Sequence, residues 1–297
     1  MGRSGHSRRR PEPRRAQWQV FAASARGAVH TGLDRPNQDA ALYWPLDLPG
    51  GGVVVAVADG HGHDRHFRSA DGSALAVSAA CATAVRRLGR TGAPRTVREA
   101  ETVVGTLAAE IVDAWAGAVT ADLVARPYTA AELAALDHND DGVLVPYGST
   151  LLLAMCLPEV VITMQIGDGD ILAISRDGTA YLPMPSPRFE GERTASLCLP
   201  QAEREFRHAA LALADFSLLA VMLVTDGYGN SQASDDWHTI AGADIAAQAR
   251  RFGVDWFAQQ LDDWARLCAS RSGAGDDTTI AMALEISAPA QIGRAHV

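Results

Sequence analysis

The stretch VVVAVADGHGH (residues 53–63) joins an apolar run to an aspartate, a glycine and two histidines. The run is typical of a buried strand, and the polar residues mark the edge of a sheet. Asp-Gly is also among the commonest turn signals in proteins. The stretch alone therefore fits either an ordinary turn or the rim of a metal site, and the positions of other aspartates become informative.

Other short runs rich in β-branched residues, bounded by Gly, Pro, Asp or Asn, predict further strands. They are 18–27, 39–44, 150–157, 160–166, 170–175, 220–225 and 278–286. Two turns predict hairpins, at residues 157–159 and at residues 167–169.

Ala-rich segments with apolar residues at helical spacing predict helices over residues 67–88 and 96–125, and a third over 243–269. Segments 126–147 and 183–216 hold most of the prolines and are predicted to be irregular. Strands, two helices, more strands, a helix and a last strand indicate an α+β fold with antiparallel sheets in one domain.

Acidic residues recur at the ends of these strands. Asp59, Asp168 and Asp226 follow predicted strands, whereas Asp39 and Asp276 precede them. In an antiparallel sheet, the end of one strand and the start of its neighbour share an edge. These five carboxylates are therefore expected to meet at one rim.

So many carboxylates repel one another unless cations neutralise them. All-oxygen ligands suit Mg²⁺ or Mn²⁺ rather than zinc. Two such ions ~3.5–4 Å apart polarise phosphoryl groups and activate water. The strand pattern alone nevertheless leaves ordinary turns and a metal site both open.

The charge distribution narrows the choice of partners. Residues 1–15 carry a net charge of +5, which leaves −14 for the rest of a chain whose total is −9. An acidic body argues against nucleic acid as a partner and suits divalent cations.

Four scattered cysteines without a CxxC pair fit a reducing cytosol. No uninterrupted apolar run reaches the ~18 residues of a membrane span, so a cytoplasmic protein without a membrane partner is expected.

The two ends of the chain are excluded from the predicted domain. Residues 1–17 are expected to form a disordered Arg-rich arm, and residues 288–297 a tail. The last six residues of that tail, IGRAHV, resemble a translated sequencing adaptor and are suspected to be non-native.

Six motifs together resemble the metal-dependent serine/threonine protein phosphatases of type 2C, in particular the compact bacterial members. They are GAVHTGLDRPNQDA (27–40), VVVAVADGHGH (53–63), YGSTLLLAM (147–155), IGDGDILAI (166–174), LVTDGYGN (223–230) and GDDTTIAMA (275–283). RFEGERTASL (188–197) also resembles a segment of the bacterial branch. The resemblance implies a catalytic domain over residues 18–287, built as a four-layer α-β-β-α sandwich of two antiparallel sheets flanked by helices.

The resemblance also implies metal ligands. Asp59 would bridge two Mg²⁺ or Mn²⁺ ions, with the Gly60 carbonyl on the second. Asp226 and Asp276 would hold the first ion, and Asp39 would act at the second, directly or through water. In bacterial relatives, a third and weaker site corresponds to Asp168 together with Asp226.

The implied reaction is in-line attack of a metal-bridging hydroxide on phosphoserine or phosphothreonine. His61 would be the general acid that protonates the leaving alkoxide; a solvent-facing loop histidine is the other interpretation. His63 matches a position that is usually Gly, so no role is expected for it. His30 occurs in many bacterial relatives and could be structural.

The chain departs from the family pattern at several positions. Gln38 replaces an acidic residue before Asp39. Asp34 occupies the place of a phosphate-binding Arg, and Arg35, one position later, is the candidate to bind phosphate instead. Asp277 aligns with the family's Asn and is expected to support the metal ligands rather than bind metal.

The first hypothesis is therefore a monomeric Mg²⁺/Mn²⁺-dependent phosphatase, acting on phosphorylated proteins that a bacterial Ser/Thr kinase has modified. Two alternatives remain open. One is a catalytically weak member of the fold that binds phosphoproteins, favoured only by the missing Arg. The other is a phosphatase for a small phosphate ester, which no residue excludes.

Overall fold

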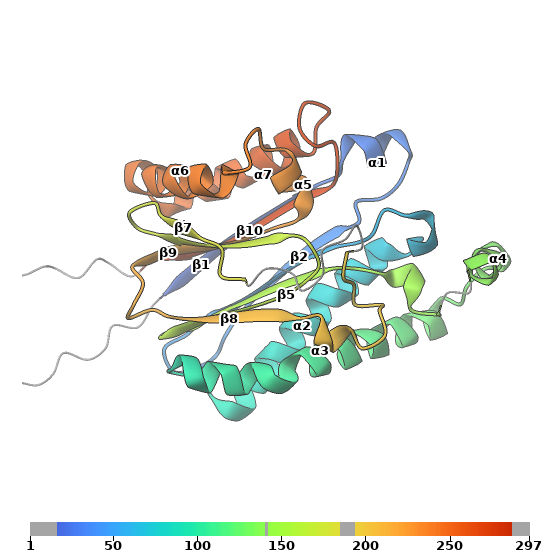
Figure 1. The fold of residues 1–297 in the computed structure, drawn as a ribbon, viewed down its shortest axis with the longest axis horizontal. Coiled ribbons are helices and arrows are strands. Elements are labelled where there is room, and N and C mark those ends of the chain that lie inside the picture. Colours follow the sequence, from blue (N-terminus) through green and yellow to red (C-terminus); the bar gives the residue numbers. More distant parts are fainter. Residues whose placement is uncertain (1–16, 140–141, 185–193, 287–297) are drawn as a thin grey trace, which may run out of the picture.

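The computed structural model describes residues 17–139, 142–184 and 194–286 (Figure 1). The expectations for residues 1–16, for the tail 288–297 and for most of the segment 188–197 concern residues outside these ranges. Two antiparallel five-stranded sheets stack face to face, and long helices cover both outer faces. The predicted four-layer α-β-β-α sandwich is confirmed.

The first sheet has the strand order β1-β10-β9-β6-β7. These strands are β1 (Trp18–Ala25), β10 (Thr278–Glu285), β9 (Leu218–Val224), β6 (Asp170–Ser175) and β7 (Ala180–Tyr181). The second sheet has the order β2-β3-β4-β5-β8. Its strands are β2 (Asp39–Pro45), β3 (Val53–Asp59), β4 (Leu151–Cys156), β5 (Val160–Ile166) and β8 (Arg207–Ala212).

The helices lie mainly in two pairs. The pair over the second sheet is α2 (Ser69–Thr91) and α3 (Val97–Ala125), and the pair over the first sheet is α6 (Trp237–Phe252) and α7 (Phe257–Cys268). Shorter helices are α1 (Ala28–Gly32), α4 (Ala130–Asn139) and α5 (Asp226–Asn230). Single 3₁₀ turns are η1 (Asp64–His66), η2 (Val145–Tyr147), η3 (Ala202–Arg204) and η4 (Val254–Trp256).

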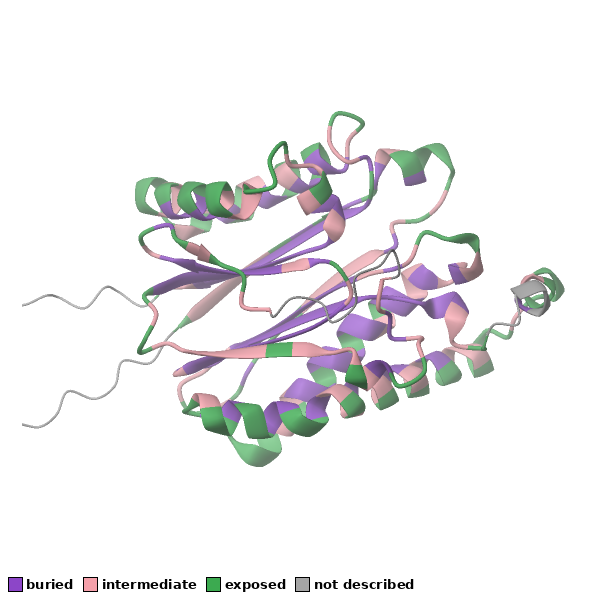
Figure 2. Ribbon diagram, in the orientation of Figure 1, coloured by how far each residue is buried: buried purple, intermediate pink, exposed green. Residues whose placement is uncertain are grey.

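The layering explains why β3 is an unbroken apolar run. Val55 and Val57 point into the core between the two sheets, where they join Leu223 of β9. The alternate residues Val54 and Ala56 face α2 and α3 on the other side. Both faces of the strand are therefore buried, as Figure 2 shows for the central strands of each sheet.

Several sequence predictions need correction. The 157–159 hairpin is confirmed, since β4 and β5 pair antiparallel. The 167–169 hairpin is wrong, because β5 and β6 belong to different sheets and the turn crosses between them. The segment 183–216, predicted to be irregular, contains β8, and 126–147 contains α4.

The third predicted helix, 243–269, is also wrong as a single element. The structure has α6 and α7 there, separated at Gly253. Gly253 has φ 81°, a left-handed conformation that ends a helix and that glycine adopts without steric cost. The apolar spacing continues across this break, which is why the pattern resembles one long helix.

Helix α3 is long and apolar enough, by length and composition, to cross a membrane. A core helix of a water-soluble domain passes the same test. Here α3 packs along α2, and Glu110 in its middle forms ion pairs with Arg87 and Arg90 of that helix. These contacts account for α3 as one of the two helices that cover the second sheet.

A close approach between α2 and η2 gives a stability prediction. A Cβ on Gly72 would lie 1.9 Å from the Tyr147 carbonyl oxygen, so Gly72→Ala is expected to destabilise the fold by about 2–3 kcal/mol. Gly89 lies on the same helix with open space around it, and Gly89→Ala should stabilise the protein by about 0.5–1 kcal/mol. Chemical denaturation of both variants measures the difference, and equal effects would contradict this packing.

Candidate metal centre

The acidic strand ends converge at one end of the sandwich. Asp39, the first residue of β2, lies directly opposite Asp59, the last residue of β3. Asp226 begins α5 two positions after the last residue of β9, and its carboxylate is among the groups that raise the pKa of Asp59. Thr225, which sequence reasoning did not select, donates its hydroxyl to Asp39 Oδ2 over 2.8 Å and so ties the two sheets together at this rim.

The carboxylates of this rim destabilise one another's charged forms. Burial, then Asp277 and Asp226, raise the pKa of Asp39 to about 8, while hydrogen bonds from Thr225 act in the opposite direction. Burial and then Asp39 and Asp226 raise the pKa of Asp59 well above its ordinary value. Burial and Asp168 raise the pKa of Asp226 in the same way. Positive charge is what this arrangement lacks.

Two unpaired oxygens test whether a cation fits. Asp39 Oδ1 and the neighbouring Gln38 Oε1 are buried and have no hydrogen-bond partner among the residues that the structure describes. Such oxygens are costly unless a cation or water satisfies them. Within the described residues, no three His, Cys, Asp or Glu side chains already surround one point as a finished ligand group. In chemistry, burial and charge, the residues nevertheless fit hard divalent cations.

Gly60 follows Asp59 in a tightly packed position. Its N–H donates to the Gln38 carbonyl over 3.0 Å. A Cβ would lie 2.6 Å from the Ser69 carbonyl oxygen and 2.7 Å from that of Gln38. Only glycine lets the chain after β3 pass between these two backbones, which fixes where its carbonyl can lie.

A matched pair of variants tests that position. Gly60→Ala should displace the rim, lowering stability by about 1–3 kcal/mol and activity by at least about tenfold. Gly62→Ala is the control, since its Cβ would meet side-chain atoms of Gln38 and His30 only at 3.8 Å. Thermal unfolding and phosphatase assays of both proteins provide the measurement. A Gly60→Ala protein as active as the Gly62→Ala protein would contradict the assignment.

His61 lies at the rim beside His66, with ring centroids 4.8 Å apart. Burial, then the neighbouring His66, lower the pKa of His61 to about 4, and Asp168 opposes this. The ring is therefore neutral at pH 7 without a bound anion, whereas a general acid must carry its proton. The acid role of His61 stays a prediction that needs a phosphoryl group nearby to raise this pKa.

Arg35 reaches the loop after β3. Its guanidinium donates to the Gly62 carbonyl over 2.6 Å and to Asp64 over 2.5 Å. In this position it clamps the DGHGHD loop, and phosphate binding would compete with Asp64. His63, for which no role was expected, is exposed and accepts from the Arg65 N–H at 3.3 Å.

Asp168 lies in the exposed turn between the two sheets. Its Oδ2 accepts from the Thr194 hydroxyl at 2.7 Å. Arg207 of β8, which the sequence did not single out, donates to the Gly167 carbonyl over 2.9 Å and holds this turn. Burial lowers the pKa of Arg207, while Asp170 and Asp168 oppose that shift. The predicted third-site residue is thus held next to Asp226 by a strand that sequence analysis missed.

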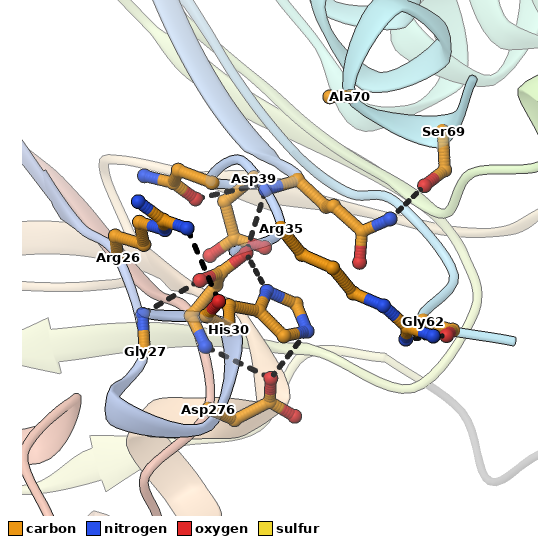
Figure 3. A network of polar contacts seen from close by, with 12 residues as sticks. Arg26, Gly27, His30, Arg35, Asp39, Gly62, Ser69, Ala70 and Asp276 are labelled. Atoms are coloured by element: carbon orange, nitrogen blue, oxygen red, sulfur yellow. Dashed lines mark hydrogen bonds and ion pairs between the residues drawn. The ribbon is translucent and has the colours of Figure 1, made fainter. Parts of the chain in front are cut away.

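Asp277 is the hydrogen-bonding hub of the rim, and two of its partners, Gly27 and His30, are labelled in Figure 3. Its side chain is 3% exposed and accepts from the Gly27 N–H and the Gln38 N–H, both at 2.6 Å, and from His30 Nδ1 at 2.7 Å. Because Gln38 precedes Asp39 and Asp277 follows Asp276, this carboxylate fixes two predicted ligands relative to each other. The sequence indicated a supporting role for Asp277, but not its partners.

The comparisons with known proteins agree with this geometry. The family model described as "Protein phosphatase 2C" matches residues 26–266, and the chain belongs to this family. A search of the curated proteins gives no match. The family supports a metal-dependent serine/threonine phosphatase activity in general terms.

Solved structures share the fold at low identity. The catalytic domain of the phosphatase PstP in complex with two manganese ions is 17% identical, with a TM-score of 0.53, over 91% of this chain and 99% of that one. Mycobacterium tuberculosis PstP/Ppp is also 17% identical, with a TM-score of 0.52, over 90% and 98%. PppA, a regulatory component of the type VI secretion system of Pseudomonas aeruginosa, is 18% identical, with a TM-score of 0.54, over 91% and 99%.

Proposed function

We propose that residues 18–287 form a Mg²⁺- or Mn²⁺-dependent phosphatase that hydrolyses phosphoserine and phosphothreonine on proteins at a two-metal aspartate centre. The observation that carries this proposal is the facing pair Asp39 and Asp59, joined by Asp226 and left with an unpaired buried oxygen. A fold that required these carboxylates only for stability would pair them with arginine or with hydrogen-bond donors.

The residues of the proposed centre would bind the cations at different positions. Asp59 lies between Asp39 and Asp226 and is the candidate bridge between two ions, with the Gly60 carbonyl beside it. Asp276 completes the first position, and Asp168 with Asp226 offers a third. Divalent cations, when bound there, neutralise the carboxylates, polarise a phosphoryl group and lower the pKa of water.

Two side chains are the candidates to act on the substrate. His61 would hold the proton for the leaving alkoxide once a phosphoryl group raises its pKa. Arg35 would orient the phosphoryl group after exchanging its contact with Asp64 for the substrate. The enzyme would act as a cytoplasmic monomer on phosphoproteins made by a bacterial Ser/Thr kinase. PppA, of similar fold, is a regulatory component of a secretion system.

The Arg35–Asp64 contact favours a second candidate function, because a guanidinium already paired at 2.5 Å binds phosphate less readily. In that case the protein would bind phosphoproteins with little turnover. A phosphatase for a small phosphate ester is the third candidate, and only substrate comparison separates it from the first.

One assay distinguishes these functions. Hydrolysis of p-nitrophenyl phosphate and of a phosphothreonine peptide is measured with Mn²⁺, with Mg²⁺ and with EDTA. We expect turnover with metal, loss of at least about a hundredfold in EDTA, and higher kcat/KM for the peptide. Activity that persists in EDTA would refute the metal centre, and peptide binding without turnover would favour the binding function. A preference for the small ester would favour the third.

A further inference from the structure

His30 lies at the rim formed by the acidic strand ends, and the proposed mechanism assigns it no task. It is the buried residue of α1, and its side chain is 9% exposed. Figure 3 shows its ring next to Asp276 of the loop before β10, and Asp277 of the same loop contacts the other ring nitrogen. Nδ1 is 2.7 Å from Asp277 Oδ2, and Nε2 is 3.8 Å from Asp276 Oδ1.

The Asp277 contact determines the tautomer of the ring. Asp277 accepts hydrogen bonds from two backbone N–H groups, from Gly27 at Oδ1 and from Gln38 at Oδ2. Asp277 Oδ2 thus already acts as an acceptor, and at 2.7 Å the matching assignment is that Nδ1 of His30 carries a proton and donates it to this oxygen. In the neutral ring this leaves the lone pair on Nε2, which faces the rim.

The distance on the Nε2 side suits a shared cation. Two ligands of one octahedral ion, with bonds of ~2.1 Å, lie about 3 Å apart when adjacent and about 4.2 Å apart when opposite. The 3.8 Å from Nε2 to Asp276 Oδ1 lies between these two values, so a small movement of the Asp276 side chain would bring both atoms onto adjacent positions of one ion. Within the described part of the chain, this is the contact that Nε2 makes, and no hydrogen bond occupies its lone pair.

We propose that His30 is a metal ligand, sharing one cation with Asp276 and oriented by Asp277. The inference builds on the proposed divalent-metal function and refines its metal preference. A carboxylate that fixes the outer nitrogen of a metal-binding histidine is a recurrent arrangement in metalloproteins. Imidazole adds a nitrogen to an otherwise all-oxygen set, so the site prefers a first-row transition ion such as Mn²⁺ to Mg²⁺.

Electron spin-echo spectroscopy of bound Mn²⁺ tests the ligand directly, because a coordinated imidazole nitrogen modulates the echo. The untagged full chain is loaded with one equivalent of Mn²⁺, and calorimetry measures its affinities for Mn²⁺ and Mg²⁺. We expect ¹⁴N modulation in the unsubstituted protein and its loss in His30→Gln. We also expect Mn²⁺ affinity to fall at least tenfold in that variant, and Mg²⁺ affinity to fall less.

Three controls make the result decisive. His208→Gln removes an exposed histidine of β8 and should keep the modulation, whereas a signal lost in His61→Gln but kept in His30→Gln would overturn the proposal. Bound Mn²⁺ without ¹⁴N modulation in the unsubstituted protein would also overturn it, even if His30→Gln weakened binding, because His30 would then only position Asp276. If His30→Gln fails to fold, modulation that persists in both His61→Gln and His208→Gln supports His30, and modulation lost in His61→Gln overturns the proposal.

The same experiment separates the ligand from the reaction. Histidine-bound Mn²⁺ in a protein without phosphatase turnover would support His30 and refute the proposed function. Phosphatase turnover with Mn²⁺ bound by oxygen alone would refute His30 as a ligand and support the proposed function. A protein that binds no Mn²⁺ would overturn both.

Discussion

Asp59→Asn should lower the phosphatase turnover by roughly a thousandfold and, in the absence of metal, raise the stability of the protein. The loss follows because Asp59 lies opposite Asp39 and interacts electrostatically with both Asp39 and Asp226. Removing the charge of this proposed bridging ligand should cost about 4 kcal/mol of transition-state stabilisation, which corresponds to about three powers of ten in rate.

The gain in stability has the same physical origin. Burial and the neighbouring carboxylates raise the pKa of Asp59 far above its ordinary value, so folding the metal-free chain at pH 7 requires an unfavourable proton uptake. An asparagine of the same shape requires none. We expect the metal-free melting temperature to rise by about 5 °C, corresponding to about 2 kcal/mol.

The measurement combines steady-state kinetics with Mn²⁺ and thermal unfolding in EDTA. Asp262→Asn is the matched control, because Asp262 is a 63% exposed residue of α7 that forms only a 3.4 Å surface pair with Arg266. It should change neither quantity. An Asp59→Asn protein that stays active, or that is less stable than the parent in EDTA, would contradict the proposed centre.

Sequence alone could predict the ligand candidates because their signal is local. Asp39, Asp59 and Asp226 each adjoin a strong apolar strand. Antiparallel pairing places Asp39 opposite Asp59, whereas the stacking of the two sheets brings Asp226 to the same rim. The hub at Asp277 could not be predicted in the same way. Its partners Gly27 and His30 are 250 and 247 residues away in the chain, and no local pattern encodes such a contact.

The difference between local and long-range signals also explains the errors in the predicted fold. β8, RHAALA, is Ala-rich and only partly buried, so it lacks the β-branched run that identifies the central strands. The turn at 167–169 predicted a hairpin because its residues permit one. Whether the next strand returns to the same sheet depends on the second layer, which lies outside any local window. Arg207, which holds that turn from β8, was missed for the same reason.

Metal-free protein should lose stability as the pH rises from 6.5 to 8. The pKa of Asp39 is 3.8 in the unfolded chain and about 8 in the folded one, so between these values the native state holds more protons. Stability then falls with rising pH, and the contribution of Asp39 is lost as the pH passes through about 8. Asp59 and Asp226 shift in the same direction.

The window above pH 6.5 isolates these carboxylates. His61 has the opposite sign, because its pKa is lowered from 6.5 to about 4 and its contribution increases with pH only up to about 6.5. For Asp39 alone the expected loss between pH 6.5 and 8 is about 2 kcal/mol, or about 5 °C in melting temperature.

Saturating Mn²⁺ should reverse this slope, because metal ligands must be deprotonated and binding to the native state stabilises it by mass action. Thermal unfolding across this pH window, in EDTA and in Mn²⁺, measures both slopes, and Asp39→Asn should flatten the metal-free one. A metal-free melting temperature that stays constant or rises with pH would mean that the rim carboxylates are already neutralised within the protein. In that case the carboxylate repulsion on which the proposed metal centre depends would be absent.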